Sequence, residues 1–238
     1  MKKLSVIVPC FNEEATLEEV VTQVSPADTA GLEMEIVIVD DCSSDSSLAI
    51  AQKLAETDPR IQVFHHTVNQ GKGAALRTGF ASATGELIIV QDADMEYDPN
   101  DYAKLIQPIL DGEADVVYGS RFLERSATEA HYLAHGLANR FLTGFSNMMT
   151  GLSLTDMETC YKLIPKAYLD QITTQENRFG IEPEMTAKLA HLSPKPRFVE
   201  RAISYKNRSY EDGKKIGWKD GVRALWCIVR YGVFGRRK

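Results

Sequence analysis

Residues 86–99 read ELIIVQDADMEYDP, an apolar run that passes directly into a group of carboxylates. The apolar run at 86–90 predicts a buried strand. Beyond it, Asp92, Asp94 and Glu96 occupy alternate positions. Alternate side chains of an extended chain point the same way, so we expect these carboxylates to project to one side. Such a group is unfavourable unless a cation lies within it.

A divalent metal that grips a substrate diphosphate is the interpretation that this acidic group favours. Mg²⁺ or Mn²⁺ suits hard oxygen ligands, and Mg²⁺ usually combines one or two carboxylates with water and substrate phosphates. The alternative is a solvated turn in which Asp98, Pro99 and Asn100 begin the next helix. That alternative accounts for Asp98, but it does not account for acids placed directly after ELIIV.

Other phosphate-binding motifs give weaker signals. The chain contains no G-x-x-x-x-G-K-[ST] stretch, and no G-x-G-x-x-G follows its first predicted strand. Gly71, Lys72 and Gly73 open a predicted helix and could direct amides and an ammonium group toward a phosphate. An ordinary loop before a helix explains the same residues equally well.

Strands and helices alternate through the first half of the chain. We expect strands at 4–8, 35–39, 61–65 and 86–90, and helices at 13–24, 44–56 and 72–83. This alternation predicts an α/β fold with a mostly parallel sheet. Ligands of such sheets bind beyond the carboxyl ends of the strands. Polar clusters follow three of the predicted strands, at 9–13, 40–43 and 92–96, so we expect the site where these clusters converge.

Length and composition indicate an ordinary soluble protein. A chain of 238 residues with 44% apolar and 25% charged residues can bury one substantial core, as a single domain with an appendage. Its four cysteines show neither metal-ligand nor disulfide spacing, which predicts reduced thiols and a cytosolic location. The first residues imitate a signal peptide only briefly, and no stretch has the roughly 18 apolar residues of a spanning helix.

The charge of the chain is unevenly distributed. Residues 201–238 carry a net charge of +8, although the whole chain has a net charge of −6. The basic end suggests contact with an anionic surface, and the acidic remainder argues against general nucleic-acid binding. A basic, solvated helix face is the alternative explanation.

The end of the chain has the pattern of an amphipathic helix. One helical stripe is apolar and comprises Val222, Leu225, Trp226, Val229 and Val233. A second stripe is basic and comprises Lys219, Arg223 and Arg230, while Trp218 and Tyr231 suit an interface. A helix lying in the headgroup region of a membrane has this character, although a helix packed on the catalytic domain would also explain it. We therefore expect a domain at 1–215 and a basic amphipathic helix at 216–238.

Five motifs occur in order along the chain: SVIVPCFNEE, IVIVDDCSSD, NQGKGAALRTGF, IIVQDAD and VVYGSRF. Over about residues 4–215 this set resembles the family 2 glycosyltransferases of the GT-A fold. Within that family it most resembles the dolichol-phosphate, or polyprenyl-phosphate, mannose and glucose synthases. The resemblance implies a Rossmann-like sheet flanked by helices and a Mg²⁺ or Mn²⁺ cofactor. It also implies inverting transfer of a hexose from GDP-mannose or UDP-glucose to dolichyl or undecaprenyl phosphate.

The resemblance also assigns roles to individual residues. It places the nucleotide among Pro9, Phe11, Glu13, Val39, Asp41, Lys72 and Asp92. It assigns the metal to Asp92 and Asp94, with Glu96 standing where the compared synthases have Gln. The implied catalytic residues are Asp94, Arg121, Asp156 and Glu158, the last two as contacts of the sugar. The implied contacts of the phosphates and the acceptor are Arg140, Arg208, Lys214 and Lys215.

Some of these assignments have simpler alternatives. Arg121 could be an exposed surface arginine, and Glu13 could simply stabilise the first turn of a helix behind Asn12. In the stretch 205–215, Arg208 and Lys214 match the family pattern, but Glu211 replaces a glycine and Gly213 replaces a serine.

The acceptor determines what the protein must do. A lipid phosphate, whose second ionisation lies near pH 6, is already largely dianionic at neutral pH and needs no protein base. The protein then holds two anions together and neutralises the departing diphosphate. A related enzyme of the cell envelope that glycosylates a saccharide or glycolipid hydroxyl would need a general base, for which Asp156 or Glu158 is the candidate. A silent nucleotide-binding protein on the same fold would bind nucleotide without turning over a donor. We expect an enzyme at the cytosolic face of a membrane.

Overall fold

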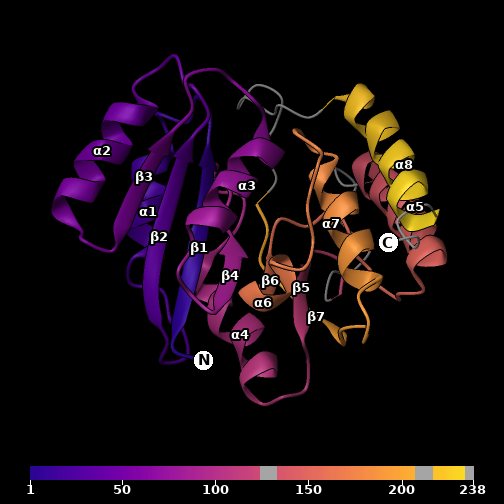
Figure 1. Ribbon diagram of the computed structural model, residues 1–238. Helices are drawn as coiled ribbons and strands as arrows, with labels where there is room; N and C mark the ends of the chain where they lie inside the picture. Colours follow the sequence, from indigo (N-terminus) through magenta and orange to yellow (C-terminus); the bar gives the residue numbers. More distant parts are fainter. Residues whose placement is uncertain (124–132, 207–216, 234–238) are drawn as a thin grey trace.

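A single mixed sheet forms the centre of the molecule (Figure 1). The computed structural model describes residues 1–123, 133–206 and 217–233. Within these residues seven strands pair in the order β3-β2-β1-β4-β6-β5-β7. The strands are β1 Lys3–Cys10, β2 Glu33–Asp40, β3 Ile61–His65, β4 Leu87–Val90, β5 Val116–Ser120, β6 Lys162–Pro165 and β7 Phe198–Ala202. All neighbouring pairs are parallel except those that β6 makes with β4 and β5, so the predicted mostly parallel sheet is confirmed.

The helices cover the sheet and continue beyond it. They are α1 Leu17–Val24, α2 Ser47–Thr57, α3 Lys72–Ser82, the 3-10 turn η1 Pro99–Asp101, α4 Tyr102–Leu110, α5 Leu133–Thr150, α6 Lys166–Leu169, α7 Ile181–Ala190 and α8 Trp218–Val233. The helix expected at 13–24 begins only at Leu17, because Thr16 and Leu17 both donate to the carbonyl oxygen of Glu13 in a preceding turn. No helix in the described residues is both long and apolar enough to cross a membrane.

The neighbouring strands β1 and β2 bring their polar ends together. Their β-branched side chains are buried on both faces of the sheet, as parallel strands covered by helices require. The two strands pair without a bulge from Lys3 opposite Glu33 to Cys10 opposite Asp40. The residues that follow β1 therefore lie beside Asp41, which follows β2.

The antiparallel strand β6 places a later part of the chain at the same edge. Leu87 of β4 pairs with Pro165, and Ile89 pairs with Leu163. Because β6 runs opposite to its neighbours, it begins where β4 and β5 end. The residues before β6, including Glu158, therefore meet those that follow β4 and β5.

Helix α8 packs on the rest of the molecule with one face and leaves another exposed. Ala224, Cys227, Ile228 and Tyr231 are buried, and Cys227 and Tyr231 pack with Ala187 of α7. As a whole, α8 lies against α7 and α5 (Figure 1). Arg223 donates twice to the carboxylate of Glu176, at 2.8 and 2.9 Å. The helix therefore packs on the domain, as one of the two explanations predicts, while most of its predicted apolar stripe remains exposed.

Candidate active site

A cavity of about 760 Å³ lies at the carboxyl edge of the sheet. Its wall follows the strand order. Residues after β1 and β2 form one side, and the carboxylates after β4 lie at the centre. The other side is formed by residues that follow β5, residues that precede β6, and residues of α5, α7 and α8. After the roles that the sequence predicts for them, we call these the nucleotide side and the transfer side. The predicted residues in the wall are Pro9, Phe11, Glu13, Asp41, Lys72, Asp92, Asp94, Glu96, Arg121 and Glu158.

Asp41 anchors the loop that begins α3. Its buried carboxylate accepts hydrogen bonds from the backbone N–H groups of Gln70, at 3.0 Å, and Gly71, at 2.6 Å. Nδ1 of His66 lies 2.7 Å from the same carboxylate, and Nε2 of His66 lies 2.9 Å from Oγ1 of Thr78. Asp41 therefore holds this loop in place. This role does not depend on any contact between Asp41 and a ligand. By contrast, Val39 is fully buried in β2 and does not line the cavity.

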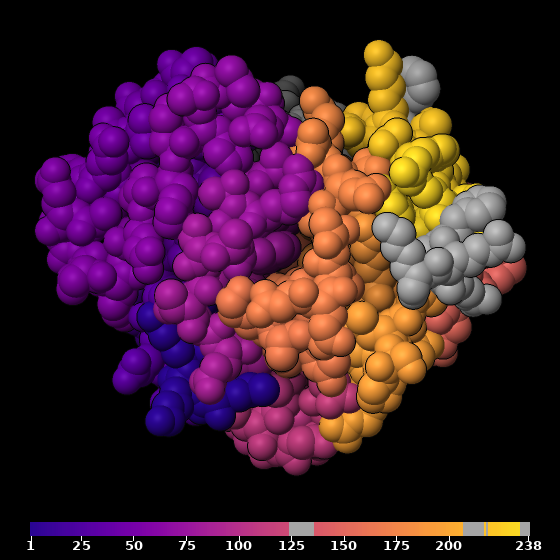
Figure 2. Space-filling view, in the orientation of Figure 1, coloured from indigo at the N-terminus to yellow at the C-terminus, as the bar shows by residue number. Residues whose placement is uncertain are grey.

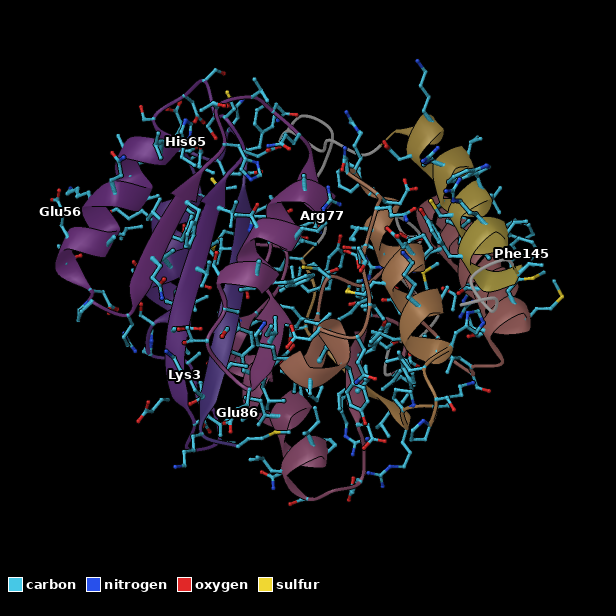
Figure 3. The ribbon with its side chains drawn as sticks, in the orientation of Figure 1. Lys3, Glu56, His65, Arg77, Glu86 and Phe145 are labelled. Atoms are coloured by element: carbon cyan, nitrogen blue, oxygen red, sulfur yellow. The ribbon has the colours of Figure 1, made fainter. Side chains whose placement is uncertain are left out.

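Two glycines allow the segment before α7 to lie against the start of α3. Gly71 has φ +95°, and a Cβ atom on Gly71 or Gly73 would collide with backbone oxygens of Asn177 and Glu176. The N–H of Gly73 donates to the oxygen of Asn177 at 2.8 Å. Arg77 of α3, labelled in Figure 3, donates to the carbonyl oxygen of Glu176 at 2.8 Å. Hydrogen bonds therefore join the start of α3 on the nucleotide side to the segment before α7 on the transfer side.

Lys72 connects two carboxylates inside the cavity. Its Nζ lies 2.7 Å from Oδ1 of Asp92 and 3.5 Å from Oε1 of Glu182. Burial disfavours the charge of Lys72, but the charge of Asp92 and, less strongly, that of Glu182 outweigh burial and raise the lysine pKa well above its ordinary value. The ammonium group of Lys72 is therefore charged.

The acidic group gathers by a turn rather than by the expected extended alternation. Met95 has φ +63°, and the N–H of Glu96 donates to Oδ1 of Asp94 at 3.2 Å. Asp92, Asp94 and Glu96 nevertheless all line the cavity. Burial, followed by the charges of Asp92 and Glu96, raises the pKa of Asp94 to about 7. Crowded carboxylates of this kind fit a site that a cation completes.

The three acids do not form a complete metal site by themselves. Among the described residues, no three or more His, Cys, Asp or Glu side chains are grouped to hold a metal ion. The Glu96 carboxylate accepts a hydrogen bond from the Tyr205 hydroxyl at 2.8 Å. Asp92 and Asp94 fit a magnesium-type site in which substrate phosphates and water supply the remaining ligands.

Arg121 lies in the cavity wall and is held from behind by Asp156. Its Nε and Nη2 donate to the two carboxylate oxygens of Asp156 at 2.6 and 2.7 Å. Asn139 donates to Oδ1 of the same fully buried carboxylate at 2.8 Å. Burial alone would raise the pKa of Asp156, but the charge and hydrogen bonds of Arg121 outweigh it and lower the pKa. Asp156 does not line the cavity, so the structure places it behind the arginine rather than beside a ligand.

Glu158 and Glu182 lie together on the transfer side. Both line the cavity, and Oε1 of Glu158 is buried with no hydrogen-bond partner among the described residues. Burial, followed by the charge of Glu182, raises the pKa of Glu158 to about 7. Glu182 forms an ion pair with the fully buried Lys162, whose Nζ also donates to the carbonyl oxygen of Thr159.

The remaining predicted contacts do not join this wall. Arg140 is exposed on α5 and does not line the cavity, whereas its neighbours Ala138, Asn139 and Leu142 do. Arg208, Lys214 and Lys215 lie outside the described residues.

Sequence reasoning missed several residues of the transfer side. They are Tyr97, Asn139, Arg178, Glu182, Tyr205 and Asp220. The sequence signal for Glu182 was its position two residues before a second acid, Glu184. The structure places both acids in the first turn of α7, which is buried along nearly its whole length.

Comparisons with known proteins show which family the chain belongs to. The model of the family "Glycosyl transferase family 2" matches residues 5–173. The chain belongs to that family. It is 38% identical to a dolichol-phosphate mannosyltransferase of Pyrococcus furiosus over 127 aligned residues. The aligned stretch covers 53% of this chain and 35% of that protein.

Two further relatives of this family 2 glycosyltransferase match it over greater lengths. An undecaprenyl-phosphate 4-deoxy-4-formamido-L-arabinose transferase of Salmonella paratyphi B is 35% identical over 90% of this chain and 63% of its own. A dodecaprenyl-phosphate galacturonate synthase of Rhizobium johnstonii is 27% identical over 99% of this chain and 68% of its own. The chain thus spans about one third to two thirds of the length of these relatives.

Among solved structures the fold is shared with a glucosyl-3-phosphoglycerate synthase of Mycobacterium tuberculosis. That protein was crystallised with Mn²⁺, uridine diphosphate and phosphoglyceric acid. The TM-score is 0.73 at 17% sequence identity, and the match covers 98% of this chain and 79% of that chain. The family 2 chain therefore has the GT-A fold, as its sequence predicted.

Proposed function

We propose that this glycosyltransferase moves a hexose, with inversion, from GDP-mannose or UDP-glucose to dolichyl or undecaprenyl phosphate. The observation that carries the proposal is the placement of Arg121 in the same cavity as Asp92 and Asp94. Such a cavity can hold a nucleotide diphosphate and a second phosphate side by side. Relatives named for sugar transfer involving polyprenyl phosphates support the same acceptor class.

Asp92 and Asp94 would hold Mg²⁺ or Mn²⁺, and Glu96 would support them from its contact with Tyr205. When bound, the metal would neutralise the charge that develops on the departing diphosphate. On the nucleotide side, Pro9, Phe11, Glu13 and Asp41 would surround the nucleoside, and only the backbone of Val39 would contribute. Lys72 would contact the diphosphate, since it already lies against Asp92.

Arg121 would orient the phosphates on the transfer side. A guanidinium group has five N–H donors, and Asp156 occupies two of them. Donors of the guanidinium group that Asp156 does not engage would reach the phosphates from a fixed orientation. We therefore propose that Asp156 positions Arg121, while Arg208, Lys214 and Lys215 add positive charge around the acceptor phosphate.

A second candidate function also has an observation in its favour. Glu158 has a pKa raised to about 7 and faces the cavity, which suits a general base. The chain would then glycosylate a hydroxyl of a saccharide or glycolipid. Glu158→Gln separates the two, because loss of a required base lowers kcat by about 10²–10⁴-fold, whereas an ionised phosphate acceptor reacts without that base.

We also propose that α5 and α8 rest on the cytosolic face of a membrane, with the basic amphipathic helix expected at 216–238 facing the membrane beside the catalytic domain expected at 1–215. Met149 near the end of α5 lies against Gly232 near the end of α8, and earlier residues of both helices border the cavity. The two helices therefore run side by side away from its mouth. Exposed apolar groups of this surface are Leu137, Phe141, Met148, Val222, Trp226, Val229 and Val233.

The surroundings of this face suit an anionic membrane. Phe145, labelled in Figure 3, stacks on Phe141 at a ring separation of 6.4 Å on the side of the molecule formed by α5 and α8. Arg140, Lys219 and Arg230 are exposed near the apolar groups. Arg140 would accordingly contact a lipid headgroup rather than the acceptor phosphate. Contiguous exposed apolar side chains with basic neighbours are typical of membrane-surface helices.

The direct test is transfer to lipid. Purified protein is incubated with Mn²⁺, polyprenyl phosphate and a panel of labelled GDP-sugars and UDP-sugars, and radioactivity is measured in the lipid phase. We expect one hexose donor to label the lipid. Labelling of water alone, or of nothing, from every donor would contradict the proposed function.

A further inference from the structure

A buried carboxylate, that of Glu176, holds α8 to the segment before α7. It accepts hydrogen bonds from Nε and Nη2 of Arg223 at 2.9 and 2.8 Å and from the hydroxyl of Tyr231 at 3.0 Å, and both residues belong to α8. Burial opposes the charge of Glu176, but these hydrogen bonds outweigh it and lower the carboxyl pKa. An ionised carboxylate with three hydrogen bonds therefore fixes the helix relative to this segment.

The main chain of the same segment holds the start of α3. The carbonyl oxygen of Glu176 accepts a hydrogen bond from Nη1 of Arg77 at 2.8 Å, and Figure 3 labels this arginine. The carbonyl oxygen of Asn177 accepts the N–H of Gly73 at 2.8 Å, and its side-chain oxygen accepts a second donor of Arg77. Glu176 is thus bound to α8 through its side chain and to α3 through its main chain.

The elements around Glu176 are closely packed. A Cβ atom on Gly180, the residue before α7, would lie 2.8 Å from both Sγ of Cys227 in α8 and Oε2 of Glu176. The N–H of Glu176 donates to the carboxylate of Glu184 in α7 at 2.7 Å. Because closely packed groups transmit displacements, a shift of α8 at Arg223 would move this segment and its contacts with α3.

Lys72 takes its position from the first turn of α3. It is the first residue of that helix, and the neighbouring N–H of Gly73 is the group that Asn177 binds. The Lys72 side chain is 16% exposed, and its Nζ lies 2.7 Å from Oδ1 of Asp92. Charge-assisted hydrogen bonds depend on distance and direction. A displacement of this first turn should therefore be measurable as lost affinity for a diphosphate.

We propose that Glu176 and Arg223 are positioning residues through which α8 holds the first turn of α3, and with it Lys72, in place for the diphosphate. This inference rests on the proposed contact between Lys72 and the diphosphate. The buried face of α8 then supports the nucleotide side, whatever the exposed face of the helix binds. The expected consequence is that nucleotide affinity depends on α8 even when no lipid is present.

Two arginines of α8 separate this role from a general effect of charge on the helix. Both lie over the ring of Trp226, Arg223 at 4.0 Å and Arg230 at 4.7 Å from its centroid. Arg223 is also bound to Glu176, whereas Arg230 is exposed and its second ring contact is with Tyr231. Arg223→Gln is therefore the main variant, and Arg230→Gln is its matched control.

Calorimetric titration with UDP and GDP in Mn²⁺ buffer without lipid measures the effect. We expect Arg223→Gln to weaken binding of the preferred nucleoside diphosphate by about threefold to tenfold, and Arg230→Gln to change it by less than about twofold. Tyr231→Phe, which removes a single hydrogen bond to Glu176, is the second variant and should weaken binding in the same direction. Wild-type affinity in both Arg223→Gln and Tyr231→Phe would overturn the positioning role.

A double-mutant cycle with Lys72→Met tests whether the effect passes through Lys72. In the Lys72→Met protein, Arg223→Gln should cause no further loss of nucleotide affinity, because the group that it positions is already absent. A loss as large as in the wild-type background would overturn the inference, since a general disturbance of the fold acts whether or not Lys72 is present.

The same titrations keep this inference distinct from the proposed function. Wild-type protein that binds a nucleoside diphosphate equally well with and without the Arg223 contact would leave the proposed function intact. Failure of the wild type to bind either UDP or GDP would overturn the proposed function and this inference with it.

Discussion

The nucleotide side and the transfer side of the cavity are built in different ways. The nucleotide side consists of consecutive parallel units, β1 to β4 with α1 to α3, and each of its motifs follows the strand that precedes it in the chain. The transfer side joins the reversed strand β6 to α5, α7 and α8. In Figure 2 the early segments, indigo to magenta, and the late segments, orange to yellow, occupy opposite halves of the molecule. Local sequence therefore predicts the positions of the cavity residues on the nucleotide side. On the transfer side these positions depend on contacts between residues far apart in the chain.

The largest effect is expected where the two sides meet. Asp94→Asn should reduce transfer of labelled hexose by about 10³-fold or more, because the departing diphosphate loses its charge partner. The control is Asp98→Asn, which makes the same change at the start of η1, where the Asp98 side chain accepts a hydrogen bond from the N–H of Asn100. Full activity of Asp94→Asn would rule out the metal role.

The next effect tests the tertiary pairing of the transfer side. Asp156→Asn should lower kcat by about 10²-fold, because Arg121 loses its orientation. Removal of one member of a buried ion pair should also lower the free energy of unfolding at pH 7 by about 3–5 kcal/mol. The folded-state pKa of Asp156 is lowered, so its contribution is present above the ordinary Asp pKa of about 3.9 and is lost as the pH falls below it.

Urea unfolding of the wild type and Asp156→Asn at pH 7 and at lower pH measures this difference. The gap in the free energy of unfolding should narrow as the pH falls. A variant that is as active as the wild type would show that Asp156 does not position Arg121.

The matching experiment among the strands of the nucleotide side concerns Glu35. This residue lies near the start of β2, at the edge of the sheet opposite the cavity. Its buried carboxylate accepts hydrogen bonds from Ser5 and Thr84 and pairs with Lys3, which Figure 3 labels. Burial opposes ionisation, but the Lys3 contact and these hydrogen bonds outweigh it and lower the pKa of Glu35 to about 2. Glu35→Gln should cost about 3 kcal/mol of unfolding free energy at pH 7.

This contribution is present above the ordinary Glu pKa and is lost as the pH falls toward 2, which urea unfolding across that range measures. Unlike Asp156→Asn, the folded Glu35→Gln protein should keep its kcat. A comparable loss of kcat in Glu35→Gln and Asp156→Asn would contradict the difference that we expect between the two carboxylates. Glu35 is expected only to stabilise the fold, whereas Asp156 is expected to position Arg121.

The smallest expected effect concerns the exposed face of α5 and α8. Phe141→Ala and Trp226→Ala should each weaken binding to anionic phospholipid vesicles by about threefold to tenfold, because each removes part of the buried apolar contact. The control is Val68→Ala on the nucleotide side, where Val68 is 62% exposed and therefore comparable to Phe141 at 63%. Sedimentation with vesicles measures the change, and an equal loss in the Val68 variant would contradict a specific docking face.

Sequence predicted the nucleotide side well because its residues follow their strands directly. Asp41 comes immediately after β2, and Asp92 is the second residue after β4, so the strand order brings them to one edge. Even here the details depended on the backbone, since the turn at Met95 replaces the expected extended alternation. Val39 precedes the end of its strand and is buried in the core.

The transfer side could not be predicted in the same way. Whether an acid faces the cavity or a neighbouring side chain depends on partners far away in the chain. Asp156 faces Arg121, which is 35 residues earlier, and Glu182 faces Lys162 from another element. Arg140 lies on the outer face of α5 because the helix packs through Asn139 and Thr143. No local spacing encodes these directions.

The most direct test of the account compares two acceptors that differ only in a phosphate. Wild-type protein with Mn²⁺ and its preferred labelled nucleotide sugar is given either polyprenyl phosphate or the matching polyprenol, and label in the lipid is measured. We predict labelling of the phosphate and none of the alcohol. Labelling of the alcohol, or of neither lipid, would contradict a cavity that joins a nucleotide sugar to a phosphate.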